Sequence, residues 1–197
     1  MNILKLKEIN KLYFGYEEIA RTCDINLSSA RVTASRYVKN GFLIRLKRNL
    51  YMLKEKWDTT QKEDKFLLAN LIQVPSYISL MTALDYYEIT TQVQREFFES
   101  VALKRTKQVD VDNTVFKYTR IKKELYFGFI RQNGYFVAEP EKALLDAIYL
   151  KYVSNYNFDE DSIDYNKINI NKLKKLSKRF PVNIQKELEK NGYFNKA

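Results

Sequence analysis

The segment 27–39 most constrains the fold, because its small and apolar positions follow one face of a helix and a hairpin pattern comes directly after it. Four of its residues recur at i, i+4, i+7 and i+8, the spacing of one buried helical face: Ala30, Ala34, Tyr37 and Val38. Residues 40–41, Asn-Gly, end the helix, and the runs 42–45 and 49–53 are typical of two strands joined by residues 46–48. We expect the buried face of this helix to pack on two helices that precede it in the chain.

Two shorter helices are predicted before this segment. Apolar residues recur at every third position over residues 3–12, which predicts an amphipathic first helix. Residues 16–22 predict a second helix with acidic residues in its first turn, where the helix dipole favours them. Residues 23–26 supply Asp and Asn for a turn, and the hydroxyls of Ser28 and Ser29 are suited to capping the third helix. Residues 1–58 thus predict three helices and a hairpin, a winged helix-turn-helix.

The outward face of the third helix predicts contact with double-stranded DNA. It carries hydroxyls and basic groups: Ser28, Ser29, Arg31, Ser35, Arg36 and Lys39. Arginine bonds bidentately to guanine, and hydroxyls reach bases or phosphates. Lys47 and Arg48 lie at the predicted hairpin tip, next to Asn49, which accepts the positive φ of a tight turn. The alternative is that these charges are solvated and that the domain contacts protein.

The basic charge is concentrated in the same region. The chain has 34 Lys and Arg against 24 Asp and Glu, a net charge of +10, and such an excess attracts polyanions. Residues 1–58 hold 12 basic and 6 acidic side chains, whereas residues 59–197 hold 22 and 18. One cysteine and no histidine make disulfide and zinc chemistry unexpected. Without a signal-peptide pattern or an apolar run long enough to cross a membrane, we expect a cytoplasmic protein.

Residues 59–197 predict a second domain, so the expected fold class is α+β, with a mostly antiparallel sheet and terminal helices. Helices are predicted at 65–72, after Ser79, at 139–150 and on both sides of Pro181, with a loop at 159–161. Four runs rich in aromatic and β-branched residues predict strands: 97–103, 114–120, 125–130 and 134–137. The helix before Pro181 has a basic face, interpreted as solvated or as a second nucleic-acid surface: Lys172, Lys174, Lys175, Lys178 and Arg179.

No pattern of catalytic residues declares itself. With five glycines and no histidine, a phosphate-binding glycine loop and a nucleophile with a histidine base are not expected. Four carboxylates could meet as a magnesium site for a nuclease: Asp85, Glu88, Glu141 and Asp146. Acidic residues at helix termini have ordinary structural roles, and we give these the structural interpretation. We therefore expect a protein that is not an enzyme, with no catalytic residue, cofactor or metal.

Three parts of the chain together resemble one protein family. They are the Asn-Gly-Phe-Leu-Ile-Arg and Asn-Leu-Tyr runs of the hairpin, residues 77–84 (Tyr-Ile-Ser-Leu-Met-Thr-Ala-Leu) and residues 140–146 (Pro-Glu-Lys-Ala-Leu-Leu-Asp). In these parts the chain resembles the AbiEi antitoxins, the repressor components of type IV toxin-antitoxin (abortive infection) systems that defend bacteria against phage. Two positions depart from the pattern: Asn49 stands where the wing tends to have glycine, and Met81 where a small residue is expected.

The resemblance implies a role for each domain. It implies that the N-terminal domain binds inverted repeats upstream of its own operon and represses it. It also implies that the C-terminal domain counteracts a nucleotidyltransferase-like toxin without requiring a stable complex. Two alternatives stay open from the residues alone: a repressor whose aromatic strands line a ligand pocket, and an adaptor that binds only protein.

Overall fold

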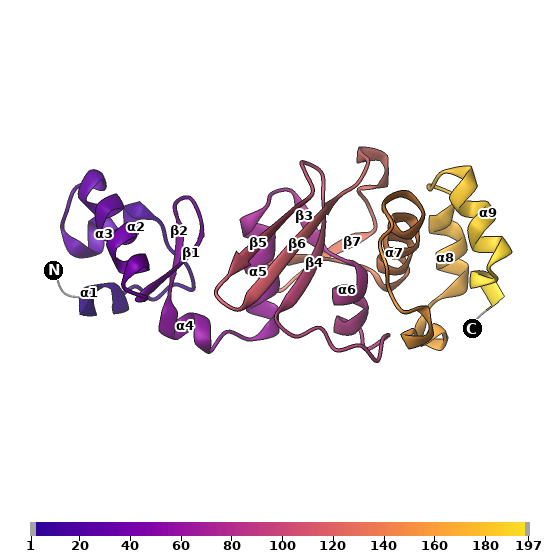
Figure 1. Ribbon diagram of the computed structural model, residues 1–197, viewed down its shortest axis with the longest axis horizontal. Helices are drawn as coiled ribbons and strands as arrows, with labels where there is room; N and C mark the ends of the chain where they lie inside the picture. The colour runs from indigo at the N-terminus through magenta and orange to yellow at the C-terminus, as the bar shows by residue number, and fades with distance from the viewer. Residues whose placement is uncertain (1–2, 196–197) are drawn as a thin grey trace. The chain divides into compact units, whose positions relative to one another are not determined.

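The computed structural model describes residues 3–195 and divides the chain into two compact units, Met1–Leu68 and Ala69–Ala197 (Figure 1). The division falls inside helix α5, C-terminal to the boundary predicted near residue 58. Both helices and sheets are present, so the fold class is α+β. Among the described residues, no helix has the length and apolar character needed to cross a membrane.

The first unit consists of short helices and one antiparallel hairpin. In chain order its elements are α1 Leu4–Lys7, α2 Tyr16–Cys23, α3 Leu27–Lys39, β1 Leu43–Lys47, β2 Leu50–Leu53 and α4 Lys54–Asp58, followed by the start of α5 Lys62–Ile72. Phe14 exchanges two backbone hydrogen bonds with Tyr51, both 2.9 Å, and so adds a third short strand segment to the hairpin. One core cluster joins α1, α2, α3 and the hairpin: Leu6, Ile9, Phe14, Ile19, Cys23, Ala30, Ala34, Tyr37, Leu43, Tyr51 and Leu53.

Helix α1 is much shorter than the predicted helix 3–12. The helix ends at Lys7, because a repeat of three residues drifts around a helix that turns every 3.6 residues. The apolar residues beyond it are used differently: Ile9 is buried from a loop, and Phe14 pairs with the hairpin. The prediction of one continuous amphipathic helix is therefore wrong.

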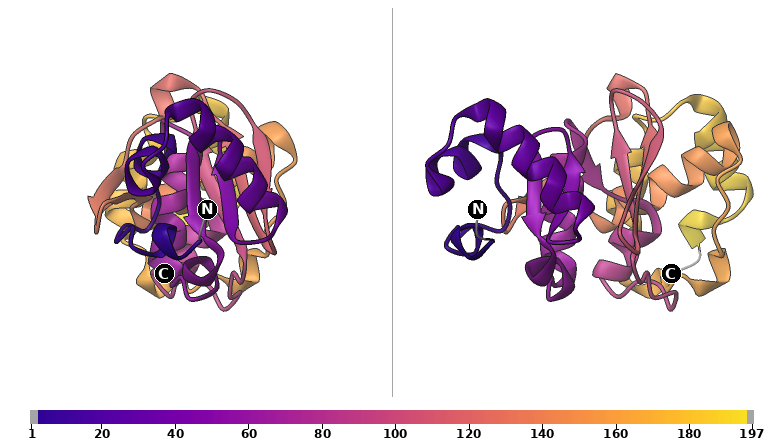
Figure 2. Two further views of the ribbon diagram at one scale, coloured as in Figure 1. Left: turned by 90° about the vertical axis from the view of Figure 1, so that its left-hand side faces the viewer. Right: turned by 60° about the vertical axis from the view of Figure 1, so that its left-hand side comes forward.

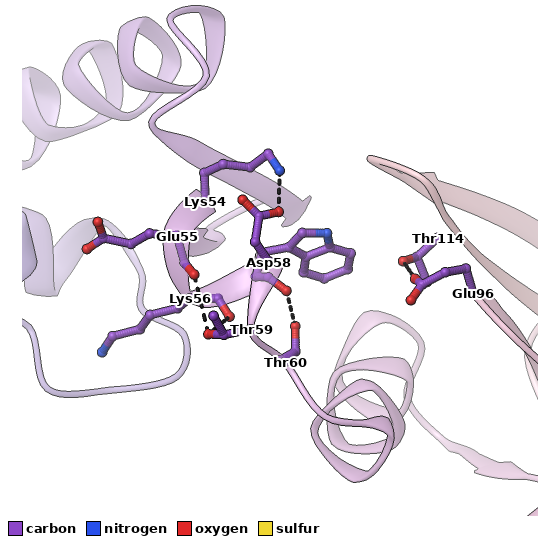
Figure 3. Close-up of polar contacts among 9 residues, drawn as sticks. Lys54, Glu55, Lys56, Asp58, Thr59, Thr60, Glu96 and Thr114 are labelled. Carbon is purple, nitrogen blue, oxygen red and sulfur yellow. Dashed lines mark hydrogen bonds and ion pairs between the residues drawn. The ribbon is translucent and has the colours of Figure 1, made fainter.

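Helix α4 was not predicted, and its end is closed by hydroxyl groups (Figure 3). Thr59 Oγ1 donates to the carbonyl oxygens of Lys56 at 3.2 Å and Glu55 at 3.4 Å, and Thr60 Oγ1 donates to that of Trp57. These side chains satisfy carbonyl groups that have no partner inside the helix. Five residues are too few for the helical period to show in the sequence.

The second unit is built on one mixed sheet of six strands, in the order β5-β6-β4-β3-β8-β7. The strands are β3 Ser76–Ile78, β4 Phe97–Ala102, β5 Lys107–Val111, β6 Thr114–Arg120, β7 Phe129–Gln132 and β8 Tyr135–Ala138. Three neighbouring pairs are antiparallel, whereas β4 with β6 and β3 with β8 are parallel. The prediction of a mostly antiparallel sheet is confirmed, although β5 was missed and β7 begins at Phe129 after a 3-10 turn at Lys123–Leu125.

Helices cover both faces of this sheet (Figure 2). On one face, Tyr118 of β6 donates from its hydroxyl to the carbonyl of Ala69 in α5 at 2.7 Å. On the other lie α6 Leu80–Tyr86 and α7 Pro140–Ser154, which is buried without a break from Glu141 to Leu150. The closing helices are α8 Ile170–Ser177 and α9 Val182–Lys190, on either side of Pro181 as predicted. The predicted loop at 159–161 is partly wrong, since Glu160–Ser162 is a 3-10 turn.

Candidate nucleic-acid interface

Helix α3 separates a buried face from a solvent face. Ala30, Ala34 and Tyr37 are buried, as the spacing predicts, and Thr33 joins them. All six residues of the predicted DNA-reading face are exposed: Ser28, Ser29, Arg31, Ser35, Arg36 and Lys39. The helix contains no acidic residue. Its solvent face therefore offers donors and positive charge, which suit base edges and phosphates.

The start of α3 is set by the turn that precedes it. Asp24 adopts a left-handed conformation with φ 52°, and the amide of Ile25 donates to the carbonyl of Ala20 at 3.0 Å. Asn26 is the residue that caps α3, because its Oδ1 accepts the amide of Ser29 at 2.8 Å. The prediction that Ser28 or Ser29 provides the cap is wrong. Both serine hydroxyls remain on the exposed first turn.

Aromatic rings lie beneath the two arginines of α3. The guanidinium carbon of Arg31 lies 5.6 Å from the centre of the Tyr16 ring, and that of Arg36 lies 5.6 Å from the centre of the Tyr37 ring. A guanidinium over an aromatic face is attracted by the ring quadrupole, and this attraction restricts the conformations of the arginine side chain. The two arginines are thus held over rings of the first unit while their side chains remain exposed.

The hairpin tip consists of Arg48 and Asn49. The predicted loop 46–48 is wrong in its bounds, because Leu46 and Lys47 belong to β1 and Lys47 pairs with Leu50. Asn49 has φ 58°, the positive value that the sequence predicts. Both Lys47 and Arg48 are exposed. The tip therefore presents two basic side chains at the end of a two-residue turn.

Asn49 connects the hairpin tip to the start of α2. Its Oδ1 accepts the amide of Tyr16 at 2.6 Å, and its Nδ2 donates to Glu17 at 3.2 Å. Two residues further along the chain, Tyr51 donates from its hydroxyl to that of Tyr16 at 2.9 Å. A Cβ on Gly15 would lie 2.9 Å from Asn49 Oδ1, so the absence of a side chain there permits the approach. Sequence reasoning missed this link, because no local pattern relates residues so far apart in the chain.

The two motifs of the second unit, residues 77–84 and 140–146, meet in a buried polar network. Asp146 Oδ2 accepts the hydroxyls of Tyr77 and Ser79, each at 2.9 Å. Lys142 Nζ donates to Tyr77 Oη at 2.9 Å and to Asp146 Oδ1. All four side chains are fully buried. Ser79 was predicted to cap α6; its hydroxyl binds Asp146 instead.

Burial disfavours the charged forms of Lys142 and Asp146, and the attraction between the two charges offsets part of this cost. Burial lowers the pKa of Lys142 and raises the pKa of Asp146, while each charge shifts its partner the other way. The ammonium also lies 5.0 Å from the centre of the Phe127 ring and 5.4 Å from that of Phe180. The ammonium and both carboxylate oxygens thus have hydrogen-bonding partners in the protein, which favours a buried ion pair. The arrangement holds β3, α6 and α7 together.

The four carboxylates considered for a magnesium site lie in separate environments. Asp85 accepts the amide of Gln94 at 3.0 Å, Glu141 accepts that of Asn169 at 3.1 Å, and Asp146 belongs to the network above. Glu88 is exposed. Within residues 3–195, no cluster of three or more potential ligands could hold a metal ion. The proposed convergence of these four carboxylates is therefore wrong.

The basic face predicted before Pro181 is only partly solvated. Lys172 is half-buried and forms ion pairs with Glu139 at 2.7 Å and with Glu141 at 3.1 Å. This corrects its predicted outward position. The other four residues of the face are exposed as predicted: Lys174, Lys175, Lys178 and Arg179. The aromatic strand residues considered for a ligand pocket include several core side chains: Phe98, Phe116, Tyr118 and Tyr135.

Comparison with known proteins adds no relative to these observations. No family model matches the chain, and no curated protein matches it. The α+β class rests on the structure itself, and the exposed face of α3 with the hairpin tip is the candidate site that geometry and charge define.

Proposed function

We propose that the chain is a DNA-binding transcriptional repressor, a binding protein rather than an enzyme. In this proposal the first unit is a winged helix-turn-helix, in which α2 and α3 are the two helices, α3 is the recognition helix and the hairpin is the wing. The observation that carries it is the division of α3 into a buried apolar face and an exposed face of hydroxyls and cations without any acid. Such a helix fits the major groove of duplex DNA, with the wing at the phosphates.

We further propose that the repressor acts as a cytoplasmic antitoxin of the AbiEi kind. It binds inverted repeats in its own promoter and represses the operon, and its second unit counteracts a nucleotidyltransferase-like toxin without a stable complex. Support comes from the motifs that carry the resemblance: Tyr77 and Ser79 from one motif and Lys142 and Asp146 from another share one buried network. Motifs that meet in the core are what a common fold requires.

A promoter assay separates the two halves of the proposal. A reporter gene is placed behind the chain's own upstream region, and the protein is supplied from a second plasmid. We expect repression by the wild type and by Lys186→Ala with Lys190→Ala, a pair of exposed lysines on α9 that serves as a charge-matched control. Arg31→Ala with Arg36→Ala should abolish repression. Repression that survives in this variant would refute α3 as the recognition helix.

The antitoxin half is tested by growth. Coexpression with the product of the adjacent gene should rescue cells from its toxicity, and the α3 double variant should rescue equally well, because neutralisation is assigned to the second unit. A failure of the wild type to rescue would remove the antitoxin role and leave the repressor.

A further inference from the structure

Two basic segments of the second unit meet at one end of the sheet (Figure 1). β4 and β6 run parallel and finish together, with Ala102 opposite Arg120. β5 starts at the same end, because it is antiparallel to β6. The amide of Arg120 donates to Thr106 Oγ1 at 3.0 Å, which joins the two connections. Segments 104–107 and 120–123, which together hold six Lys or Arg and no acid, therefore lie side by side.

The C-terminal end of α8 adds further basic residues through an aromatic contact. The rings of Phe127 and Phe180 are 6.0 Å apart, and the guanidinium carbon of Arg179 lies 3.5 Å from the centre of the Phe127 ring. Phe127 comes four residues after Lys123, the last residue of the second basic segment. The contact of Arg179 with Phe127 therefore brings Lys178 and Arg179 close to that segment. We call the resulting surface the basic rim: Lys104, Arg105, Lys107, Arg120, Lys122, Lys123, Lys178 and Arg179.

Seven of the eight basic-rim charges are not neutralised by ion pairs within the part of the chain that the structure describes. All of its members except the half-buried Lys107 are exposed, and none of these seven forms an ion pair among residues 3–195. Other exposed lysines do pair, as Lys7 does with Glu55 and Lys151 with Glu160. Like charges gathered at one end repel one another and create a positive potential. A polyanion would supply the missing counter-charge.

Arg179 gives the basic rim a flat surface for stacking. Arg179 is an exposed residue whose guanidinium lies over the Phe127 ring, and the ammonium of Lys142 lies 5.0 Å from the centre of the same ring. Unpaired bases stack on guanidinium planes and aromatic rings, and lysines around them hold the phosphates. A duplex keeps its bases stacked inside and cannot use such a platform. The combination of unpaired cations and an exposed planar group therefore favours a single strand.

We propose that the basic rim binds single-stranded nucleic acid, with Arg179 stacking on a base and the surrounding lysines and arginines contacting phosphates. This activity belongs to the second unit and is independent of the DNA-reading face of α3. It would give the protein a second polynucleotide ligand besides operator DNA.

Fluorescence anisotropy with the full-length protein tests this. The probes are a labelled single-stranded RNA, the DNA strand of the same sequence and an unrelated duplex. Lys122→Ala with Lys123→Ala should weaken single-strand binding about tenfold or more and flatten its salt dependence. Arg179→Lys, which keeps the charge and removes the plane, should weaken it about fivefold or more. Lys186→Ala with Lys190→Ala should bind as the wild type does.

The remaining outcomes separate this proposal from the repressor proposal. Tighter binding of RNA than of the DNA strand would identify RNA as the ligand, and equal binding would identify any single strand. Arg31→Ala with Arg36→Ala should leave single-strand binding intact even where operator binding is lost. Unchanged single-strand affinity in the basic-rim variants would overturn the proposal. The proposal would also be overturned if the duplex bound as tightly as the single strands and the lysine substitutions weakened duplex binding equally.

Discussion

Asn49 at the hairpin tip accepts the backbone amide of Tyr16 at 2.6 Å and thereby fixes the tip to the first turn of α2. The same asparagine provides the positive φ of the turn, 58°, so one side chain shapes the hairpin and places it. Because Arg31 of α3 lies over the ring of Tyr16, the tip and the candidate reading face share one support. The relative position of the wing and the recognition helix in our proposal thus depends on a few polar contacts.

Asn49→Gly should isolate the contribution of this link. Glycine keeps the positive φ and removes only the hydrogen-bonding side chain, so we expect the first unit to lose about 1 to 2 kcal/mol of stability. Urea unfolding followed by the fluorescence of Trp57, the single tryptophan, measures this unit. Arg48→Gly, which alters the same turn without removing a hydrogen bond of Asn49, is the control. Equal midpoints for Asn49→Gly and the wild type would show that the link is not stabilising.

Lys142→Met should destabilise the second unit by about 3 to 5 kcal/mol, because it leaves the buried carboxylate of Asp146 without its cation. Adding Asp146→Leu to it should recover part of this loss, since no buried charge then remains. Chemical denaturation followed by far-UV circular dichroism provides both values. Additive losses in the double variant would contradict an ion pair as the organising contact.

Gly128 makes room for Lys142. Its φ is +71°, and a Cβ there would lie 2.9 Å from Lys142 Cγ, whereas Gly192, with φ +67°, has nothing within 4 Å of a Cβ. Both Gly128→Ala and Gly192→Ala pay the cost of a positive φ, about 1 kcal/mol. Only Gly128→Ala meets the lysine, so its loss of thermal stability should be clearly the larger of the two. Equal shifts in Tm would mean that the lysine moves aside freely.

Glu99 should make the second unit less stable as pH rises. Burial raises the pKa of Glu99 above its ordinary value of 4.5, and the hydroxyl of Tyr156, which donates to it at 2.7 Å, offsets part of the effect. A folded state with the higher pKa binds more protons than the unfolded state, so stability falls as pH rises from 4.5 through the raised pKa. Glu99→Gln should remove this slope. The test measures denaturation midpoints of the wild type and of Glu99→Gln across that pH interval. Equal changes with pH in the two proteins would exclude Glu99 as the cause.

The sequence predicts elements where a local period is complete. The thirteen residues of α3 cover several helical turns, so the spacing of its residues alone predicts both its buried face and its exposed face. The edge strand β5, Lys-Gln-Val-Asp-Val, carries polar residues on an exposed sheet edge and lacks the apolar character by which strands are recognised. Residues 3–12 show the opposite error, in which an apolar repeat exists but tertiary contacts divide its residues between a helix and a loop.

The buried network could not be derived from the sequence by such rules. Tyr77 and Asp146 are 69 residues apart, and only the packing of α7 over β3 brings them within 2.9 Å. Read locally, Lys142 and Asp146 form an ordinary i,i+4 pair on a helix, which would be solvated on most proteins. Their full burial is a property of the assembled sheet and helices.

The most direct test of the central claim is the affinity of the protein for its own upstream DNA, measured by fluorescence anisotropy against a scrambled duplex at several salt concentrations. We predict a preference for the upstream DNA of roughly a thousandfold, lost in Arg31→Ala with Arg36→Ala and kept in Lys186→Ala with Lys190→Ala. Equal, weak and strongly salt-dependent binding of the wild type to both duplexes would contradict a sequence-reading α3.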